Sequence, residues 1–328
     1  MPVPHLLCIL DGFGWGPPDA ANAIHLAHTP TWDRLLAEHP WCLLSAHGTA
    51  VGMPGDGDMG NSEVGHNAMG AGRVFDQGAK LVANAIADGS LFDGKGWAAV
   101  RSRCQAGGTL HLLGLVSDGN VHSHVDHLHA LVGRAAKEGL ARLRVHVLTD
   151  GRDVAPRSAL EWVVPLEHTL ARHREDGLNY AIASGGGRMV ITMDRYEADW
   201  PMVARGWAHH VLGQGERVAS ASQAIADRYE ADPKVDDQWL PPFVVGDYTG
   251  MADGDAVVLF NFRGDRAIEI SRAFEAGDDF KAFARGQRPE VLFVGMMEYD
   301  GDLHIPAHTL VAPPAITGTV SEALAQAG

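Results

Sequence analysis

Residues 110–137 read LHLLGLVSDGNVHSHVDHLHALVGRAAK. A short apolar run, 110–116, is followed by a polar loop that contains Gly119, and then by a stretch, 126–137, whose apolar residues have the spacing of an amphipathic helix. The same order of apolar run, glycine-rich loop and helical pattern recurs along the chain. This alternation is typical of layered folds, so the sequence predicts an α/β fold.

Six apolar runs are predicted strands, and most of them precede a predicted helix. The strands are 6–10, 110–116, 143–148, 180–183, 256–260 and 291–294, and the helices are 30–38, 126–137, 158–173, 220–229 and 267–275. A further helix is expected over 319–327, capped by Gly328. Residues 70–78 and 310–314 are the best linker candidates because glycine and proline punctuate them.

Composition limits the class of protein. A chain of 328 residues is expected to form about two domains. A net charge of −15 opposes binding to nucleic acid and to anionic membranes, although a local cluster of arginines could still bind a small anion. Three cysteines without a CxxC pair favour neither a disulfide framework nor a thiolate zinc site. No apolar run is long enough for a signal peptide or a membrane span, so a cytoplasmic protein is expected.

Asp11 follows the first apolar run and precedes Gly12 and Gly14. A carboxylate at the end of a buried strand, where the backbone can come close to a cation, suits a metal ligand. A turn-forming aspartate that merely ends a strand explains the same residues equally well.

Ser62 lies in the segment 58–73, DMGNSEVGHNAMGAGR. Asn61 or Ser62 stands where a helix could begin, with Glu63 in its first turn, so the Ser62 hydroxyl could lie at the positive helix end, where a phosphoryl group is favoured. A nucleophilic serine needs a base or a metal, and His66 is the only nearby base, so a metal is the more economical activator. From these residues alone, a plain N-cap serine is the simpler explanation.

The stretch 122–127, HSHVDH, has the HxHxDH spacing of dinuclear zinc hydrolases. Such a site needs further ligands downstream, and no convincing partner segment follows. The alternative is that His127 and His129 belong to a helix surface while only His122 faces a cleft.

Two kinds of anion-binding candidate follow the later strands. Arg152 and Asp153, in TDGRDVAPR (149–157), could offer a phosphate clamp and a proton-transfer carboxylate, or simply a surface ion pair. Two arginine pairs also follow strands, and arginine forks bind carboxylate and phosphate groups in a bidentate manner. The pairs are Arg188 with Arg195, and Arg263 with Arg266.

Eight stretches, taken together and in this order, resemble the cofactor-independent phosphoglycerate mutases, especially their plant and trypanosomatid-like branch. They are LDGFGWGP (10–17), AHGTAVGMP (46–54), GDMGNSEVGHNAMGAGR (57–73), SDGNVHSH (117–124), TDGRDVAPRS (149–158), SGGGRMVITMDRYEADW (184–200), FNFRGDRAIE (260–269) and GMMEYDGDL (295–303).

The resemblance implies interconversion of 3-phosphoglycerate and 2-phosphoglycerate through a phosphoserine. It implies that Ser62 is the nucleophile and a metal ligand, that Asp11 binds the same metal, and that Asp153 carries a proton. It also implies a substrate-binding set of His122, Arg152, Asp153, Arg188, Arg195, Arg263 and Arg266. Two Mn²⁺ or other divalent ions, no 2,3-bisphosphoglycerate and a monomeric state are expected, and the zinc-like spacing of 122–127 becomes a coincidence.

The family's fold is an alkaline-phosphatase-like metal domain with an inserted α/β transferase domain. On this pattern, residues 1–75 and 311–328 belong to the metal domain, which is incomplete here, and residues 76–310 form the inserted domain. Family members continue past the equivalent of Gly328 into a region that supplies a lysine and further Asp and His ligands. Two alternatives therefore stay open: a metal-dependent phosphohydrolase or phosphopentomutase relative, and a fragment that binds substrate without turning it over.

Overall fold

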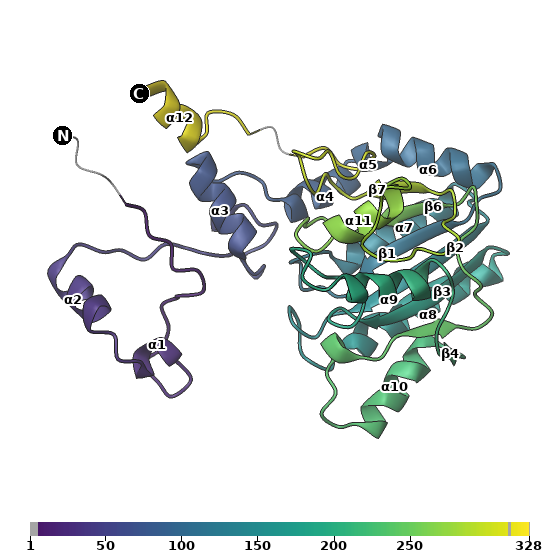
Figure 1. Ribbon diagram of the computed structural model, residues 1–328, viewed down its shortest axis with the longest axis horizontal. Helices are drawn as coiled ribbons and strands as arrows, with labels where there is room; N and C mark the ends of the chain where they lie inside the picture. The colour runs from purple at the N-terminus through teal and green to yellow at the C-terminus, as the bar shows by residue number, and fades with distance from the viewer. Residues whose placement is uncertain (1–5, 314–315, 328) are drawn as a thin grey trace.

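The computed structural model of the chain describes residues 6–313 and 316–327. Its centre is a seven-stranded sheet with the strand order β4-β5-β3-β2-β1-β6-β7 (Figure 1). Neighbouring strands are parallel except for β3 and β5, which are antiparallel. The strands are β1 (Leu110–Leu115), β2 (Arg142–Thr149), β3 (Asn179–Gly187), β4 (Arg217–Val218), β5 (Phe243–Val245), β6 (Ala256–Leu259) and β7 (Leu292–Gly295).

Helices precede the sheet, connect its strands and follow it. They are α1 (Ala23–Leu26), α2 (Pro30–Glu38), α3 (Ser62–Ala71), α4 (Gly78–Ala87), α5 (Ser90–Asp93), α6 (Lys95–Gln105), α7 (Val125–Lys137), α8 (Ala159–Glu175), α9 (Trp200–His210), α10 (Ala221–Ala231), α11 (Ile268–Glu275) and α12 (Val320–Ala327). Two 3₁₀ turns, η1 (Gly48–Val51) and η2 (Asp237–Trp239), complete the described elements. Each of these helices is too short or too polar to cross a lipid bilayer.

The sheet separates two apolar cores because side chains alternate along each strand. In β1, Leu110 and Leu112 join the larger core, beneath α4 to α8 and α10, whereas Leu113 and Leu115 join the smaller one, beneath α9 and α11. Parallel strands covered on both faces need apolar residues on both sides. The continuous apolar runs of the sequence therefore predicted β1, β2, β3, β6 and β7 correctly.

The strand order changes direction between β1 and β6. From β1 the chain moves outward through β2 to β3, and the later strands β6 and β7 lie on the other side of β1. In parallel sheets, the carboxyl ends of the strands on either side of such a switch point open into a crevice where ligands bind. The loops after β1, β2, β3 and β6 all end at this edge.

Most of the predicted elements are confirmed, with shifts of at most four residues at their ends. The predicted helix over 319–327 is α12, while its proposed cap, residue 328, lies outside the described residues. Of the first linker candidate, residues 72–77 connect α3 to α4, whereas residues 70, 71 and 78 belong to these helices. In the second, Leu310 and Val311 are buried in the larger core, and residue 314 lies outside the described residues. Strands β4 and β5 and helices α1, α4, α5, α6 and α9 were not predicted.

The predicted strand over 6–10 is wrong. These residues form no strand in the structure, and Leu6 is 91% exposed. A strand needs a hydrogen-bonded neighbour, and none pairs with this run in the part of the chain that the structure describes. Residues 6–47 extend away from the sheet, as the purple part of Figure 1 shows, and none of them is buried. Helix α12 lies beside α3, and Arg73 donates a hydrogen bond of 2.7 Å to the Thr317 carbonyl.

Candidate active site

Four loops at the carboxyl edge of the sheet carry the predicted substrate-binding residues. His122 follows β1, Arg152 and Asp153 follow β2, and Arg188 and Arg195 follow β3. Arg263 and Arg266 follow β6, which is the neighbour of β1 across the switch point. The structure thus brings together residues that are up to 144 positions apart in the sequence, whereas their roles stay predictions.

Hydrogen bonds fix these loops to one another. The His122 carbonyl accepts a 2.7 Å bond from the Phe262 N–H, which joins the loop after β1 to the loop after β6. The buried Arg188 guanidinium donates to Asp150 at 2.7 Å and to Asp153 at 2.5 Å. A buried charge needs such partners. The alternative of a surface ion pair between Arg152 and Asp153 is therefore wrong, because Asp153 pairs with an arginine that is 1% exposed.

Burial and neighbouring arginines shift the pKa values of two site residues. Burial, followed by the nearby charges of Arg188 and Arg263, holds the pKa of His122 well below its usual range. The His122 imidazole is therefore neutral at physiological pH. Burial and the charges of Arg188 and Arg195 lower the pKa of Arg266 to about 10, so it stays protonated there. A neutral imidazole surrounded by guanidinium groups suits a substrate with two negative groups.

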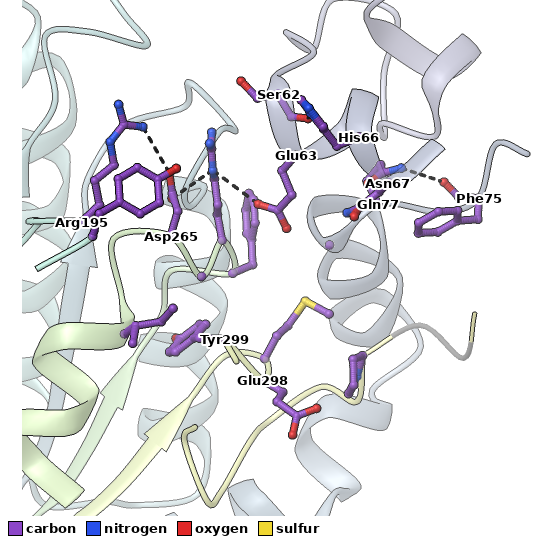
Figure 2. Close-up of a pocket in the computed structure, with 18 of the residues that line it drawn as sticks. Ser62, Glu63, His66, Asn67, Phe75, Gln77, Arg195, Asp265, Glu298 and Tyr299 are labelled. Carbon is purple, nitrogen blue, oxygen red and sulfur yellow. Dashed lines mark hydrogen bonds and ion pairs between the residues drawn. The ribbon is translucent and has the colours of Figure 1, made fainter. Parts of the chain in front are cut away.

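A cavity of about 740 Å³ opens between this edge and helix α3. Figure 2 shows Ser62, Glu63 and His66 projecting from one side, with Arg195 and Asp265 on the other. Of the predicted residues, Asp11, Ser62, Arg195 and Arg263 line it. His122, Arg152, Asp153, Arg188 and Arg266 are outside its lining; His122, Arg188 and Arg266 are buried in the loops behind it.

Ser62 and Asp11 lie together although 51 positions separate them in the sequence. The Ser62 hydroxyl donates a 3.0 Å hydrogen bond to Asp11. Asn61 is the N-cap of α3 and accepts from the Val64 N–H, so the N-cap interpretation of Ser62 is wrong. His66 bonds the Ser62 carbonyl, at 2.7 Å, through its Nδ1. The hydroxyl therefore stands in the first turn of a helix, at the cavity, beside a carboxylate.

The described residues suit a divalent metal only in part. Asp11 and Ser62 present oxygen donors, which hard cations such as Mn²⁺ or Mg²⁺ prefer, but such ions take about six ligands. Within the described ranges, no group of three or more His, Cys, Asp or Glu side chains gathers to hold a metal. This finding also argues against the zinc interpretation of 122–127. His127 is in a helix, as the alternative expected, but it is buried against the Phe262 ring rather than on the surface.

Sequence reasoning missed two acidic residues of the site. Asp265 lies 3.0 Å from Arg263 and 3.7 Å from both Arg195 and His122. Glu63 lies 3.4 Å from Arg263, and burial raises its pKa more than Arg263 lowers it. Asp265 stands between two candidate arginines in FNFRGDR, and this position could have indicated that it pairs with one of them. The pairing of Glu63 carried no sequence signal because it joins residues 200 positions apart.

Buried polar atoms without a hydrogen-bond partner concentrate at this edge. In the described part of the chain there are eight such side-chain atoms, and five belong to the site: Asn120 Oδ1, His122 Nδ1, Arg188 Nε, Arg263 Nε and Asp265 Oδ1. Arg263 and Asp265 approach at ion-pair distance but without hydrogen-bond geometry. Buried polar groups are normally paired, so this concentration is typical of a site that receives a polar ligand.

Comparisons with known proteins agree with this geometry. A family model described as the N-terminus of BPG-independent PGAM matches residues 82–301. The chain is 53% identical over 327 residues to a probable 2,3-bisphosphoglycerate-independent phosphoglycerate mutase of Leptospira interrogans, which covers 98% of this chain and 60% of that protein. A 2,3-bisphosphoglycerate-independent phosphoglycerate mutase of Ricinus communis is 49% identical over 330 residues, with coverage of 98% and 59%.

A solved structure of Leishmania mexicana phosphoglycerate mutase at low cobalt concentration is also similar. Its TM-score is 0.93 at 49% sequence identity, and the match covers 98% of this chain and 59% of that one. The resemblance to plant and trypanosomatid proteins is therefore confirmed. The chain spans about 60% of the length of the curated relatives it matches.

Proposed function

Because the chain belongs to the family of 2,3-bisphosphoglycerate-independent phosphoglycerate mutases, we propose that it carries the nucleophile and substrate-binding residues of an enzyme that interconverts 3-phosphoglycerate and 2-phosphoglycerate. The observation that carries the proposal is the position of the Ser62 hydroxyl, which faces a cluster of arginines across one cavity. The substrate carries a carboxylate and a phosphate, and both are groups that arginine forks bind.

In the proposed reaction, Arg195 and Arg263 hold the substrate at the cavity wall. The Ser62 oxygen attacks phosphorus in line while its proton passes to Asp11, so an O–P bond forms to serine as the bond to the 3-oxygen breaks and the 3-oxygen takes a proton from Asp153. Glycerate stays bound by its carboxylate and turns, and the phosphoryl group returns from Ser62 to the 2-oxygen. Asp153, which its ion pair with Arg188 holds in place, carries the proton between the two hydroxyl positions.

Asp11 orients the Ser62 hydroxyl by accepting its hydrogen bond. The same two residues would hold a divalent metal, which we propose to be one of two Mn²⁺ ions of the complete enzyme. When bound, the metal would lower the pKa of the hydroxyl and neutralise charge on the phosphoryl oxygens. The name of the family excludes 2,3-bisphosphoglycerate as a requirement of the reaction.

The domain division at residues 75 and 311 is part of the proposal. It is supported by the absence of buried residues within 6–47 and by the contact between α12 and α3. Some residues of 48–75, among them Met53 and Val64, nevertheless pack into the larger core.

We also propose a cytoplasmic monomer without nucleic-acid or membrane partners, which the net charge of −15 and the free cysteines Cys8, Cys42 and Cys104 support.

Calorimetric titration of the chain with 3-phosphoglycerate tests the binding part of the proposal. Arg195→Ala and Arg263→Ala should each weaken binding about tenfold or more, because each removes a charged donor from the cavity wall. Arg103→Ala is the matched control: this arginine lies on α6, at the opposite edge of the sheet, in an exposed ion pair with Glu290. Equal affinities of all three variants would contradict the assignment of the site.

The chemical part needs a chain of the relatives' full length. We suggest joining residues 1–328 to the remainder of the Leptospira protein and incubating the product with Mn²⁺ and 3-phosphoglycerate. Mass spectrometry should find phosphate on Ser62, and the Ser62→Ala variant should form neither phosphoenzyme nor 2-phosphoglycerate. Mutase activity retained by Ser62→Ala would refute the proposal. Release of inorganic phosphate without 2-phosphoglycerate would favour a phosphohydrolase instead.

A further inference from the structure

A continuous row of buried hydrogen bonds crosses the sheet beneath α9, away from the cavity. It begins at Asp255 beside the amino end of β6, passes through β1, β2 and β3, and ends in the loop after β3. The distances are 3.1 Å from Asp255 to His111, 2.9 Å from His111 to His146, 2.7 Å from His146 to Ser184, 2.7 Å from Ser184 to His210, and 3.0 Å from His210 to Thr192.

Proton counting fixes the direction of every bond in this row. Asp255 accepts from His111 and from two backbone N–H groups; burial alone would raise its pKa, but these bonds lower it overall, so it is ionised. Burial lowers the pKa of His111 and of His146, and lowers that of His210 to about 3, so each ring carries one proton. An ionised Asp255 can only accept, and each neutral ring then donates on one side and accepts on the other.

The row therefore runs one way. His111 donates through Nε2 to Asp255, His146 donates through Nε2 to His111, and the Ser184 hydroxyl donates to His146 Nδ1. His210 donates through Nδ1 to Ser184, and the Thr192 hydroxyl donates to His210 Nε2. Bonds aligned in this manner polarise and strengthen one another in a buried setting.

A change of register brings Ser184 into the row. Val145 of β2 pairs with Ile182 of β3, but the next residue, His146, pairs with Ser184, so Ala183 is an extra residue in β3. Such irregularities re-aim side chains, often near active sites. Without it, His146 would pair with Ala183, which has no hydroxyl.

Thr192 is the end of the row and stands in a costly conformation. Its φ is +71°, a value that branched residues rarely adopt. Gly206 on α9 makes room for it, because a Cβ there would lie 2.1 Å from the Thr192 hydroxyl. The space at Gly206 lets the Thr192 hydroxyl lie against α9, where it bonds His210 one helical turn further on.

The residues after Thr192 include one candidate anion-binding arginine and contact a second. The Met193 carbonyl accepts a 2.6 Å hydrogen bond from Arg266, and Arg195 lines the cavity. We propose that the one-way row from Thr192 to Asp255 is a positioning device, which holds the backbone of residues 192–195 so that Arg195 faces the cavity and the Met193 carbonyl keeps its hydrogen bond to Arg266. The substrate part of this inference rests on the proposed function, whereas the direction of the row does not.

The direction is tested on the whole chain without substrate, by nitrogen NMR of ¹⁵N-histidine-labelled protein at pH 7. We expect all three rings of the row to be neutral, with the proton of His111 and of His146 on Nε2 and that of His210 on Nδ1. Signals are assigned with single His→Gln variants. A proton on Nδ1 of His146, or a doubly protonated ring at any of the three positions, would overturn the row.

The positioning role is tested with Thr192→Val and its matched control Thr192→Ser. Valine keeps the shape but removes the donor, whereas serine keeps the hydroxyl. We expect Thr192→Val to weaken 3-phosphoglycerate binding about tenfold and to shift the backbone amide signals of residues 193–196, with Thr192→Ser close to the native chain. Unchanged amide signals in Thr192→Val refute positioning even if the native chain binds no phosphoglycerate, and that failure of binding would refute the proposed function separately.

Discussion

At the scale of single residues, contact with Thr192 explains why a glycine stands at position 206 of helix α9. A Cβ on Gly206 would meet the Thr192 hydroxyl at 2.1 Å and the Thr192 Cβ at 3.0 Å. Gly206→Ala should therefore lower the free energy of unfolding by about 1–3 kcal/mol in urea titrations, although alanine is the better helix former.

Gly133 on α7 is the matched control for this prediction. It is exposed, and an added Cβ would meet nothing within 4 Å. Gly133→Ala should raise the free energy of unfolding by about 0.5–1 kcal/mol because it restricts the unfolded chain. Equal effects of the two substitutions would show that contact with Thr192 is not what keeps glycine at 206.

His127 makes a prediction about pH. Burial lowers its pKa to about 4, whereas in the unfolded chain it is near 6.5. Between pH 6.5 and pH 4 the unfolded chain thus binds one more proton at this residue, and the free energy of unfolding falls by about 1.4 kcal/mol per pH unit as the pH decreases. His127→Phe keeps the contact with Phe262 and removes this titrating group. In urea titrations at several pH values, the dependence of the free energy of unfolding on pH should therefore fall by about 1.4 kcal/mol per pH unit between pH 6.5 and pH 4. An unchanged slope would contradict it.

The sequence indicated where the candidate site residues lie in those cases where each of them directly follows a strand, whereas their roles stay predictions. His122, Arg152, Arg188 and Arg263 follow buried strands, so their convergence at one edge follows from the parallel sheet. The partners of these residues were harder to find. Asp265 and Glu63 act on Arg263 across loops, and no local pattern indicates such pairs.

At the scale of elements, helix α8 shows a cap that comes from elsewhere in the chain. Ser158, the residue before α8, makes no capping hydrogen bond with its side chain. Asp237 of η2 instead accepts from the Ser158 and Ala159 N–H groups at 2.8 and 2.9 Å. Asp237→Ala should lower the free energy of unfolding by about 2 kcal/mol, because two helix N–H groups lose their acceptor in a buried place.

Asp227→Ala is the control for the α8 prediction. Asp227 is an acidic residue of α10 whose bond to Gln223 is exposed, and its removal should change stability by less than about 0.5 kcal/mol. A stability loss no larger than that of Asp227→Ala would contradict the cap.

The elements that the sequence predicted are those with a strong pattern of their own. Strands β1, β2 and β6 are buried on both faces and appear as apolar runs. Strands β4 and β5 have two and three residues, too few to show a pattern. The run 6–10 has the pattern without the structure, because an apolar run becomes a strand only where a neighbouring strand pairs with it.

At the scale of the whole molecule, buried residues begin only at position 48 in the part of the chain that the structure describes. None of the residues 6–47 is buried, although this segment contains many large apolar side chains. Those more than half exposed include Leu6, Leu7, Leu10, Trp15, Leu26, Trp41, Leu43 and Leu44. In contrast, Val51, Met53 and Val64 already join the core beneath the sheet. The segment 6–47 therefore adds little to the stability of this chain, whereas 48–71 contributes to its core.

Two truncations test this division. A chain that starts at residue 48 should unfold within about 1 kcal/mol of the native chain in urea, since none of the described residues that it loses is buried. A chain that starts at residue 78 should lose at least about 4 kcal/mol, because three buried apolar side chains contribute about 1.5–3 kcal/mol each. Limited proteolysis of the intact chain should cut first within 6–47, where the backbone is least protected. If both truncations were equally costly, the apolar side chains of 6–47 would have to be packed in solution, and the division drawn here would be wrong.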